Sequence, residues 1–163
     1  MLSTLLDKDD RNLKTLKHTI NYVEFYITNV CNFNCVSCNR FNNYAFKGQE
    51  RWADVEPIYT RWAQRLNLPR IGIMGGEPMA NPDYMLYLKG LHRLWPEATI
   101  CLQTNGSLLK PKNRELYNIC KDSNGLIYLA ISLHNSNRMS SMLETDKEWL
   151  VGDLDIEHRS GID

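Results

Sequence analysis

The strongest constraint on the fold is a regular alternation of short apolar runs with segments of helical periodicity. Runs typical of strands occur at 20–28, 70–74, 99–103 and 126–133, and amphipathic segments typical of helices separate them. The last run, LIYLAISL, is almost continuously apolar, as expected for a parallel strand covered on both faces. About four successive β-α units predict an α/β fold, with a parallel sheet and right-handed crossovers to helices outside it.

Helices are predicted between these strands from their start signals and their apolar spacing. The first would begin at Asp54 as N-cap, the second after Asn81-Pro82 and the third at Pro111, and a weaker pattern follows at 138–150. The apolar residues expected to face the sheet are Val55, Ile58, Trp62 and Leu66, then Tyr84, Leu88, Leu91 and Trp95, and then Leu116, Ile119 and Cys120.

Length and charge favour a single domain without a strongly basic surface. We expect an N-terminal extension over 1–19, an α/β core over 20–151 and a polar loop-like tail over 152–163. Basic and acidic residues balance at 19 each, so no positive field favours nucleic acid or an anionic membrane. No signal-peptide pattern starts the chain, and no apolar run reaches the roughly 20 residues of a membrane span. We therefore expect a cytoplasmic protein.

Polar residues follow the predicted strands at their carboxyl ends. In parallel α/β folds, ligands bind beyond this edge of the sheet. One ligand could therefore contact all of these segments. In chain order they are Cys31 to Cys38, Gly75-Gly76-Glu77, Thr104-Asn105, and Ser132 with His134.

Three of the five cysteines lie within eight residues, in the sequence CNFNCVSC at 31–38. An odd number of cysteines, closely clustered, does not suit a disulfide framework and points to a metal in a reducing compartment. Three thiolates on one loop can bind three corners of an iron-sulfur cubane. Such clusters normally take four cysteines, so this loop either borrows a distant ligand or leaves one iron open.

The spacing of Cys31, Cys35 and Cys38 resembles the CxxxCxxC signature of the radical S-adenosylmethionine (radical SAM) superfamily, and GGEP at 75–78 matches the glycine-glycine-glutamate motif of that family. The resemblance implies a partial (β/α) barrel of the radical SAM type, covering roughly the N-terminal two thirds of the family core. It also implies a 4Fe-4S cluster on the three cysteines and S-adenosylmethionine on the open iron. In that family, reductive cleavage of S-adenosylmethionine yields a 5′-deoxyadenosyl radical that abstracts hydrogen from a substrate.

The resemblance further implies cofactor contacts and a redox partner. Gly75, Gly76 and Glu77 would hold the methionyl amine, and Ser132 with Thr104 or Asn105 would contact the ribose or carboxylate. A reductant such as flavodoxin or ferredoxin would supply the electron. No motif identifies further catalytic residues or the substrate, although the neutral charge mildly favours a peptide or small molecule over nucleic acid.

Two departures from the family pattern qualify the resemblance. The family usually has an aromatic residue just before the third cysteine, where this chain has Ser37. The family core has six β-α units, whereas about four are predicted here. A second chain could complete the barrel.

Alternatives of two other classes stay open. The cysteines could form a zinc site with His134 or His18 as fourth ligand, although this leaves the Gly-Gly-Glu motif unexplained. The chain could also be a non-catalytic remnant that binds a partner through an exposed sheet edge. We expect Cys101 and Cys120 to be buried small apolar residues rather than ligands of a second cluster.

Overall fold

The computed structural model describes residues 17–35, 38–41, 47–109, 113–133 and 159–160. Within them, a parallel five-stranded sheet has the order β2-β4-β5-β6-β7, and β1 pairs with β3 in a separate two-stranded sheet. The elements are β1 His18–Thr19, β2 Val23–Tyr26, α2 Trp52–Ala63, β3 Leu66–Asn67, β4 Arg70–Met74, the 3-10 helix η2 Pro78–Ala80, α3 Tyr84–Leu94, β5 Thr99–Thr104, α4 Arg114–Asp122, β6 Ile127–Leu133 and β7 Arg159–Ser160.

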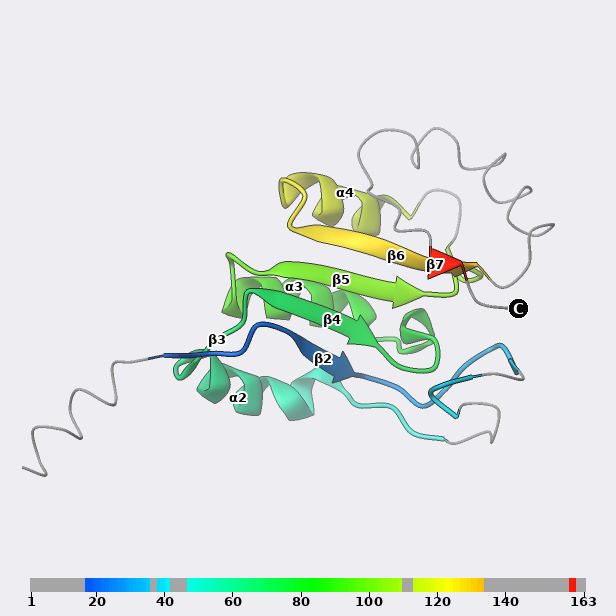
Figure 1. Cartoon of the computed structure of the whole chain (residues 1–163), viewed down its shortest axis with the longest axis horizontal. Helices are drawn as coiled ribbons and strands as arrows, with labels where there is room; N and C mark the ends of the chain where they lie inside the picture. Colours follow the sequence, from blue (N-terminus) through cyan, green and yellow to red (C-terminus); the bar gives the residue numbers. More distant parts are fainter. Residues whose placement is uncertain (1–16, 36–37, 42–46, 110–112, 134–158, 161–163) are drawn as a thin grey trace, which may run out of the picture.

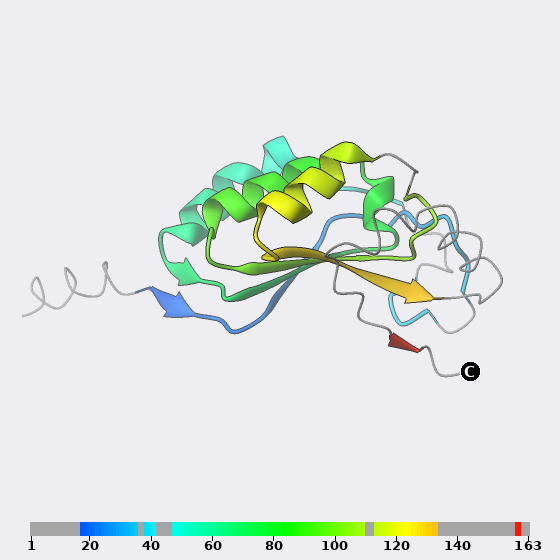
Figure 2. The same cartoon turned by 90° about the horizontal axis from the view of Figure 1, so that it is seen from above.

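The helices α2, α3 and α4 lie on the same face of the sheet (Figures 1 and 2). They connect β2 to β4, β4 to β5 and β5 to β6, so each crossover joins neighbouring parallel strands. A doubly wound sheet would carry helices on both faces, whereas a (β/α) barrel keeps them all outside. The predicted α/β fold of a partial barrel with parallel strands is confirmed.

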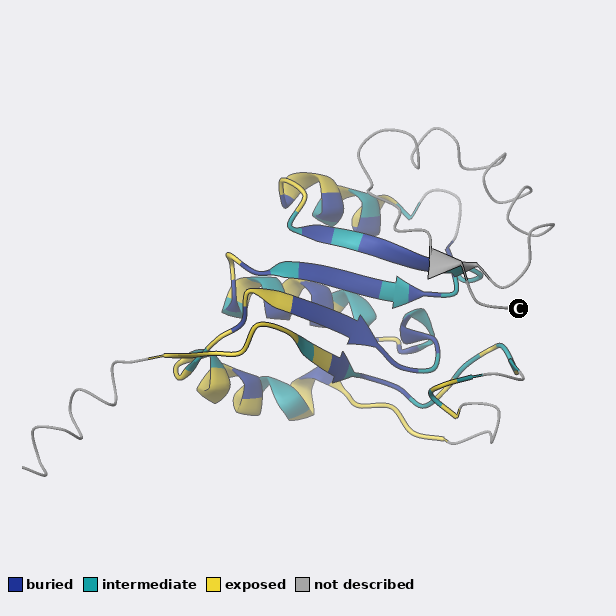
Figure 3. Cartoon of the chain, viewed as in Figure 1, coloured by how far each residue is buried: buried dark blue, intermediate teal, exposed yellow. Residues whose placement is uncertain are grey.

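The core lies between the sheet and these helices, and the central strands β4 and β5 are buried along most of their length (Figure 3). The strand register places Phe25 opposite Ile73, and Ile73 opposite Leu102. These side chains form one apolar layer because successive residues of a strand point to opposite faces. Beneath this layer α2 and α3 pack closely, since a Cβ at Gly90 would lie only 2.0 Å from Cζ2 of Trp52.

The first helix differs from its prediction in start and in orientation. Helix α2 begins at Trp52 with Arg51 as N-cap, not at Asp54. It buries Trp52 and Tyr59, while the predicted inward residues Ile58 and Trp62 are 39% and 43% exposed, and Leu66 belongs to β3. The physical reason is that Trp52 and Tyr59 share one face of the helix and pack their rings together, with centroids 6.0 Å apart.

The later helices follow their predicted apolar faces. Helix α3 buries Leu88 and Leu91, and α4 buries Leu116 and Cys120. The start of α4 is capped by the side chain of Asn113, which accepts a hydrogen bond from the backbone N–H of Leu116 at 3.2 Å. The segment at 138–150 lies outside the described residues. No helix of the described part is long and apolar enough to cross a membrane.

The polar tail was predicted to be a loop, which is wrong for Arg159–Ser160. These residues form β7, which pairs in parallel with Ser132 and Leu133 of β6. The reason is that the free edge of a strand presents unpaired N–H and C=O groups, which a polar segment can pair as well as an apolar one.

Candidate functional site

The cysteine loop leaves the sheet after β2, and hydrogen bonds close its base. The backbone N–H of Ile27 donates to the carbonyl of Met74 at 2.9 Å, which continues the sheet pairing past β2. Thr28 then forms an antiparallel bridge with Gln49, and the N–H of Asn29 donates to the Gly48 carbonyl at 2.8 Å. The two ends of the loop formed by residues 30–47 therefore lie side by side.

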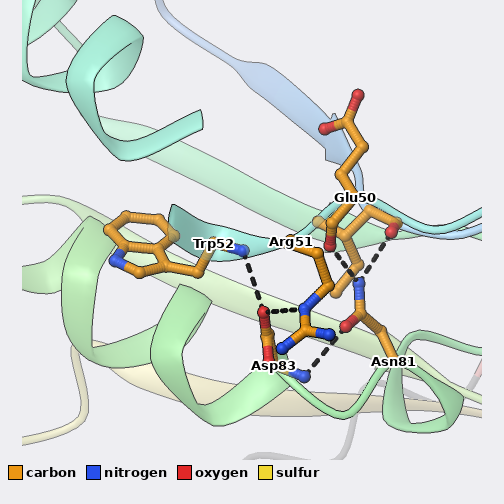
Figure 4. Close-up of polar contacts among 6 residues, drawn as sticks. Glu50, Arg51, Trp52, Asn81 and Asp83 are labelled. Atoms are coloured by element: carbon orange, nitrogen blue, oxygen red, sulfur yellow. Dashed lines mark hydrogen bonds and ion pairs between the residues drawn. The ribbon is translucent and has the colours of Figure 1, made fainter. Parts of the chain in front are cut away.

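Asn81, which directly follows η2, binds the chain on both sides of the loop base (Figure 4). Its Nδ2 donates to the carbonyl of Ile27 at 2.8 Å and to the carbonyl of Glu50 at 2.9 Å. Its Oδ1 accepts from the backbone N–H of Asp83 at 2.9 Å. Asn81 is fully buried, so these bonds satisfy an amide that would otherwise be costly to enclose. One side chain therefore ties the loop base to the segment that follows β4.

Asp83 joins the same network to the start of α2 (Figure 4). Its Oδ2 accepts from the backbone N–H of Trp52 at 3.0 Å and from Nε of Arg51 at 2.9 Å. The hydrogen bond from Arg51, followed by that from Trp52, lowers the pKa of the Asp83 carboxyl below its ordinary value. A carboxylate at this position also interacts favourably with the N-terminal end of the helix dipole.

Gly75 and Gly76 lie against the first residues of the cysteine loop. The N–H of Gly76 donates to the carbonyl of Thr28, and the N–H of Glu77 donates to that of Val30, both at 2.8 Å. A Cβ at Gly75 would lie 2.4 Å from the Thr28 oxygen, and one at Gly76 would lie 2.4 Å from the Val30 oxygen. Glycine is required at both positions because the backbone of the loop passes too close for a side chain.

The carboxylate of Glu77 connects the ends of β4 and β5. It is fully buried, and its Oε1 accepts from Oγ1 of Thr104 at 2.7 Å and from the N–H of Met79 at 3.0 Å. Its Oε2 accepts from the N–H of Asn105 at 2.7 Å. Burial raises the pKa of the Glu77 carboxyl, and these hydrogen bonds oppose that shift. Both carboxylate oxygens are therefore engaged by donors of the protein itself.

Asn105 reaches from the end of β5 back to the cysteine loop. Its Nδ2 donates to Oδ1 of Asn32 at 3.0 Å and lies 4.0 Å from Sγ of Cys31. Asn32 in turn donates from Nδ2 to Oγ of Ser107 at 2.7 Å. Asn32 and Ser107 were not among the predicted site residues, although both are short polar residues beside a motif, a signal that could have identified them.

The three clustered cysteines are half-buried, and none of the five cysteines forms a disulfide. The pKa of the Cys35 thiol is raised, first by burial and then by the negative charges of Cys31 and Cys38, so the three share one electrostatic environment. Within the described ranges, no group of three His, Cys, Asp or Glu residues is gathered as a preformed metal site. The loop thus offers thiol donors that fit an iron-sulfur cluster, and these must converge when it binds.

The other residues predicted or considered for the site do not all lie near the cysteine loop. Ser132 is half-buried near the carboxyl end of β6, directly after Ile131, which lies opposite Thr104. Cys101 and Cys120 are buried, which confirms that prediction. His18, considered as a zinc ligand, lies in β1, whose pairing with β3 places it at the opposite end of the sheet from the cysteine loop (Figure 1). His134 lies outside the described residues.

Comparison with known proteins places this chain in a family. Residues 25–148 match the family described as the Radical SAM superfamily. Among curated proteins, GTP 3′,8-cyclase of Campylobacter jejuni (strain RM1221) is 28% identical over 146 residues, which cover 88% of this chain and 42% of that protein. GTP 3′,8-cyclase of Nautilia profundicola is 29% identical over 114 residues, covering 69% and 34%. This chain therefore spans less than half the length of these relatives.

A solved structure supports the same fold. The crystal structure of BtrN in complex with AdoMet and 2-DOIA superposes with a TM-score of 0.53 and 17% sequence identity, covering 82% of this chain and 56% of BtrN. At this identity the likeness concerns the arrangement of strands and helices. The family match and the partial barrel agree with the two motifs, and this chain belongs to the radical SAM superfamily, whose members use a 4Fe-4S cluster and S-adenosylmethionine.

Proposed function

We propose that this chain binds a 4Fe-4S cluster through Cys31, Cys35 and Cys38 and takes part in the reductive cleavage of S-adenosylmethionine. When bound, the cluster supplies the electron that converts S-adenosylmethionine to a hydrogen-abstracting 5′-deoxyadenosyl radical. The observation that carries this proposal is the convergence of three segments at one sheet edge. There the Gly-Gly-Glu turn is bonded to the start of the cysteine loop, and Asn105 is bonded to Asn32 within the loop.

The chain's own residues would bind and orient the cofactors. The three thiolates would hold three irons and leave the fourth open to S-adenosylmethionine. Because the carboxylate of Glu77 is engaged by other donors, the main-chain carbonyls of Gly75 and Gly76 are the better acceptors for the methionyl amine.

The polar contacts would come from Asn105 and Ser132. Thr104 is only 2% exposed, and its hydroxyl donates to Glu77 and accepts from the N–H of Gly106 at 3.0 Å. Asn105 and Ser132 are both half-buried at the same edge of the sheet. We therefore assign the carboxylate or ribose contact to the more exposed turn at Asn105 rather than to the buried Thr104, and a ribose contact to Ser132.

The substrate and partners of the whole protein are part of the proposal. A small molecule agrees with the activity named for the curated relatives, the GTP 3′,8-cyclases. A cytoplasmic reductant such as flavodoxin or ferredoxin would supply the electron, in a compartment that keeps the cysteines reduced. A further segment or a second chain would supply the rest of the barrel.

The test is anaerobic reconstitution with iron and sulfide, reduction with dithionite, and chromatographic assay of 5′-deoxyadenosine. We expect product from the wild type and from the control Cys120→Ala, which alters a cysteine buried in α4, and none from Cys35→Ala. A cluster without product would contradict cleavage by this chain alone. Retention of zinc with no iron or sulfide would overturn the proposal as a whole.

A further inference from the structure

The buried carboxylate of Glu77 is linked to a cluster ligand through a single intervening residue. We propose that Glu77 is a positioning residue that holds Asn105 beside Cys31, and that this contact raises the reduction potential of the bound cluster. The inference rests on the proposed function, because it concerns the cluster that Cys31 would ligate.

The first step is the anchoring of the turn after β5. Glu77 accepts the hydroxyl of Thr104 on one oxygen and the backbone N–H of Asn105 on the other, both at 2.7 Å. The N–H of Gly106, a residue with φ of 73°, then donates to Oγ1 of Thr104 at 3.0 Å. The backbone position of Asn105 is thus set by a side chain that belongs to the turn after β4.

The second step is the orientation of the Asn105 amide. Its Oδ1 accepts from the backbone N–H of Ser107 at 2.9 Å and from Oγ of Ser107 at 2.6 Å. Because two donors fix the oxygen, the NH₂ group must point the other way. It points toward the cysteine loop, where it donates to Asn32 and lies 4.0 Å from Sγ of Cys31.

The third step is the effect on the sulfur. Sγ of Cys31 also accepts from the backbone N–H of Phe33 at 3.4 Å, so two N–H groups face the same atom. Hydrogen bonds to cysteine sulfur stabilise the extra negative charge of the reduced cluster and so raise its potential. The donor from Asn105 belongs to a side chain, so a substitution can remove it, whereas the donor from Phe33 belongs to the backbone.

The negative charge of Glu77 should lower the reduction potential, whereas its positioning of Asn105 should raise it. Because the two effects have opposite signs, substitutions can separate them. Glu77→Asp keeps the charge but is too short to reach both Thr104 and Asn105, so loss of alignment should lower the potential. Glu77→Gln removes the charge, so a purely electrostatic influence would raise the potential in that variant and leave Glu77→Asp unchanged.

The experiment is a redox titration of the reconstituted full chain, followed by electron paramagnetic resonance without S-adenosylmethionine. We expect the midpoint to shift to more negative values in Asn105→Ala and, by a smaller amount, in Glu77→Asp. The double variant should match Asn105→Ala alone, because Glu77 acts through Asn105. The control Asn67→Ala removes an exposed amide bonded to Thr19 and should leave the midpoint unchanged.

Unchanged midpoints in the Asn105→Ala cluster, or additive shifts in the double variant, would overturn the inference. Asn105→Asp keeps the shape of the side chain and replaces the donor by an oxygen, so it should shift the midpoint further in the negative direction. If neither Asn105 variant assembles a cluster while the wild type does, an effect on potential is also overturned. Absence of a cluster in the wild type would instead refute the proposed function.

Discussion

The two faces of the sheet differ in what holds their side chains. Toward the helices, residues such as Ile73, Leu102 and Leu129 are at most 1% exposed and belong to the apolar core. On the opposite face, Glu24 pairs with Arg40 at 2.9 Å, both side chains being about one third exposed, and the hydroxyl of Tyr22 donates to Glu24 at 3.1 Å. The first face supplies the apolar core, whereas on the second the Glu24–Arg40 pair can carry charge because its contacts stay partly solvated.

The largest expected effect comes from breaking the helix-covered face. Leu102→Ala should lower the free energy of unfolding by about 2 to 5 kcal/mol, because it removes fully buried methyl groups and leaves a cavity. Chemical denaturation measures this loss. Leu86→Ala is the matched control, since Leu86 is 48% exposed on α3, and equal losses in the two variants would contradict the contrast between buried and exposed leucines.

A second prediction compares two glycines near the sheet. Gly76→Ala should cost about 1 to 3 kcal/mol of stability, because its Cβ would meet backbone atoms of the cysteine loop. Gly72→Ala should cost less, because the closest atom to its Cβ, at 2.6 Å, is the hydroxyl of the exposed Tyr22, which can move aside. Thermal unfolding of both variants ranks them, and a larger loss at Gly72 would show that the opposite face is packed as rigidly as the loop base.

The third prediction concerns pH. The pKa of Asp83 is lowered from its ordinary 3.8, so its carboxylate stabilises the fold above that pH and this contribution is lost as pH falls through the folded-state pKa. Asp83→Asn should cost about 1 kcal/mol at neutral pH and flatten the acid limb of a stability profile measured by urea denaturation. An acid limb in Asp83→Asn as steep as that of the wild type would contradict this role for the Asp83 carboxylate.

The smallest effect is expected on the charged face. Glu24→Gln should change stability by about 0 to 1 kcal/mol, because an ion pair that is partly exposed gains little over hydration. Denaturation at low and high salt measures it. A loss well above this range would mean that Glu24 and Arg40 are part of the folding core after all.

Local patterns predicted the four longer strands, β2, β4, β5 and β6, but not the two-residue strands β1, β3 and β7, and they failed where distant segments meet. The strand at 70–74 was predicted with its observed ends because an apolar run between a proline and two glycines is readable locally. The face of α2 was misjudged because the helix carries large apolar residues on two sides, and only packing against β2 and α3 selects Trp52 and Tyr59. The hydrogen bond between Asn32 and Ser107 joins residues 75 positions apart in the sequence, and local periodicity cannot predict a contact over such a separation.

The amide of Asn81, which holds both ends of the cysteine loop, has a consequence for how such a loop can change. Once its ends are fixed, the entropy of closing a loop grows only logarithmically with length, by about 0.6 kcal/mol for each doubling. The part of the segment after the cysteines can therefore change in length at little cost in closure entropy, provided that Val30, Cys31 and Asn32 keep their contacts with the sheet edge. Because Asn81 holds both ends of the loop, this geometry permits a design in which residues 41–46 are exchanged for the corresponding stretch of a relative.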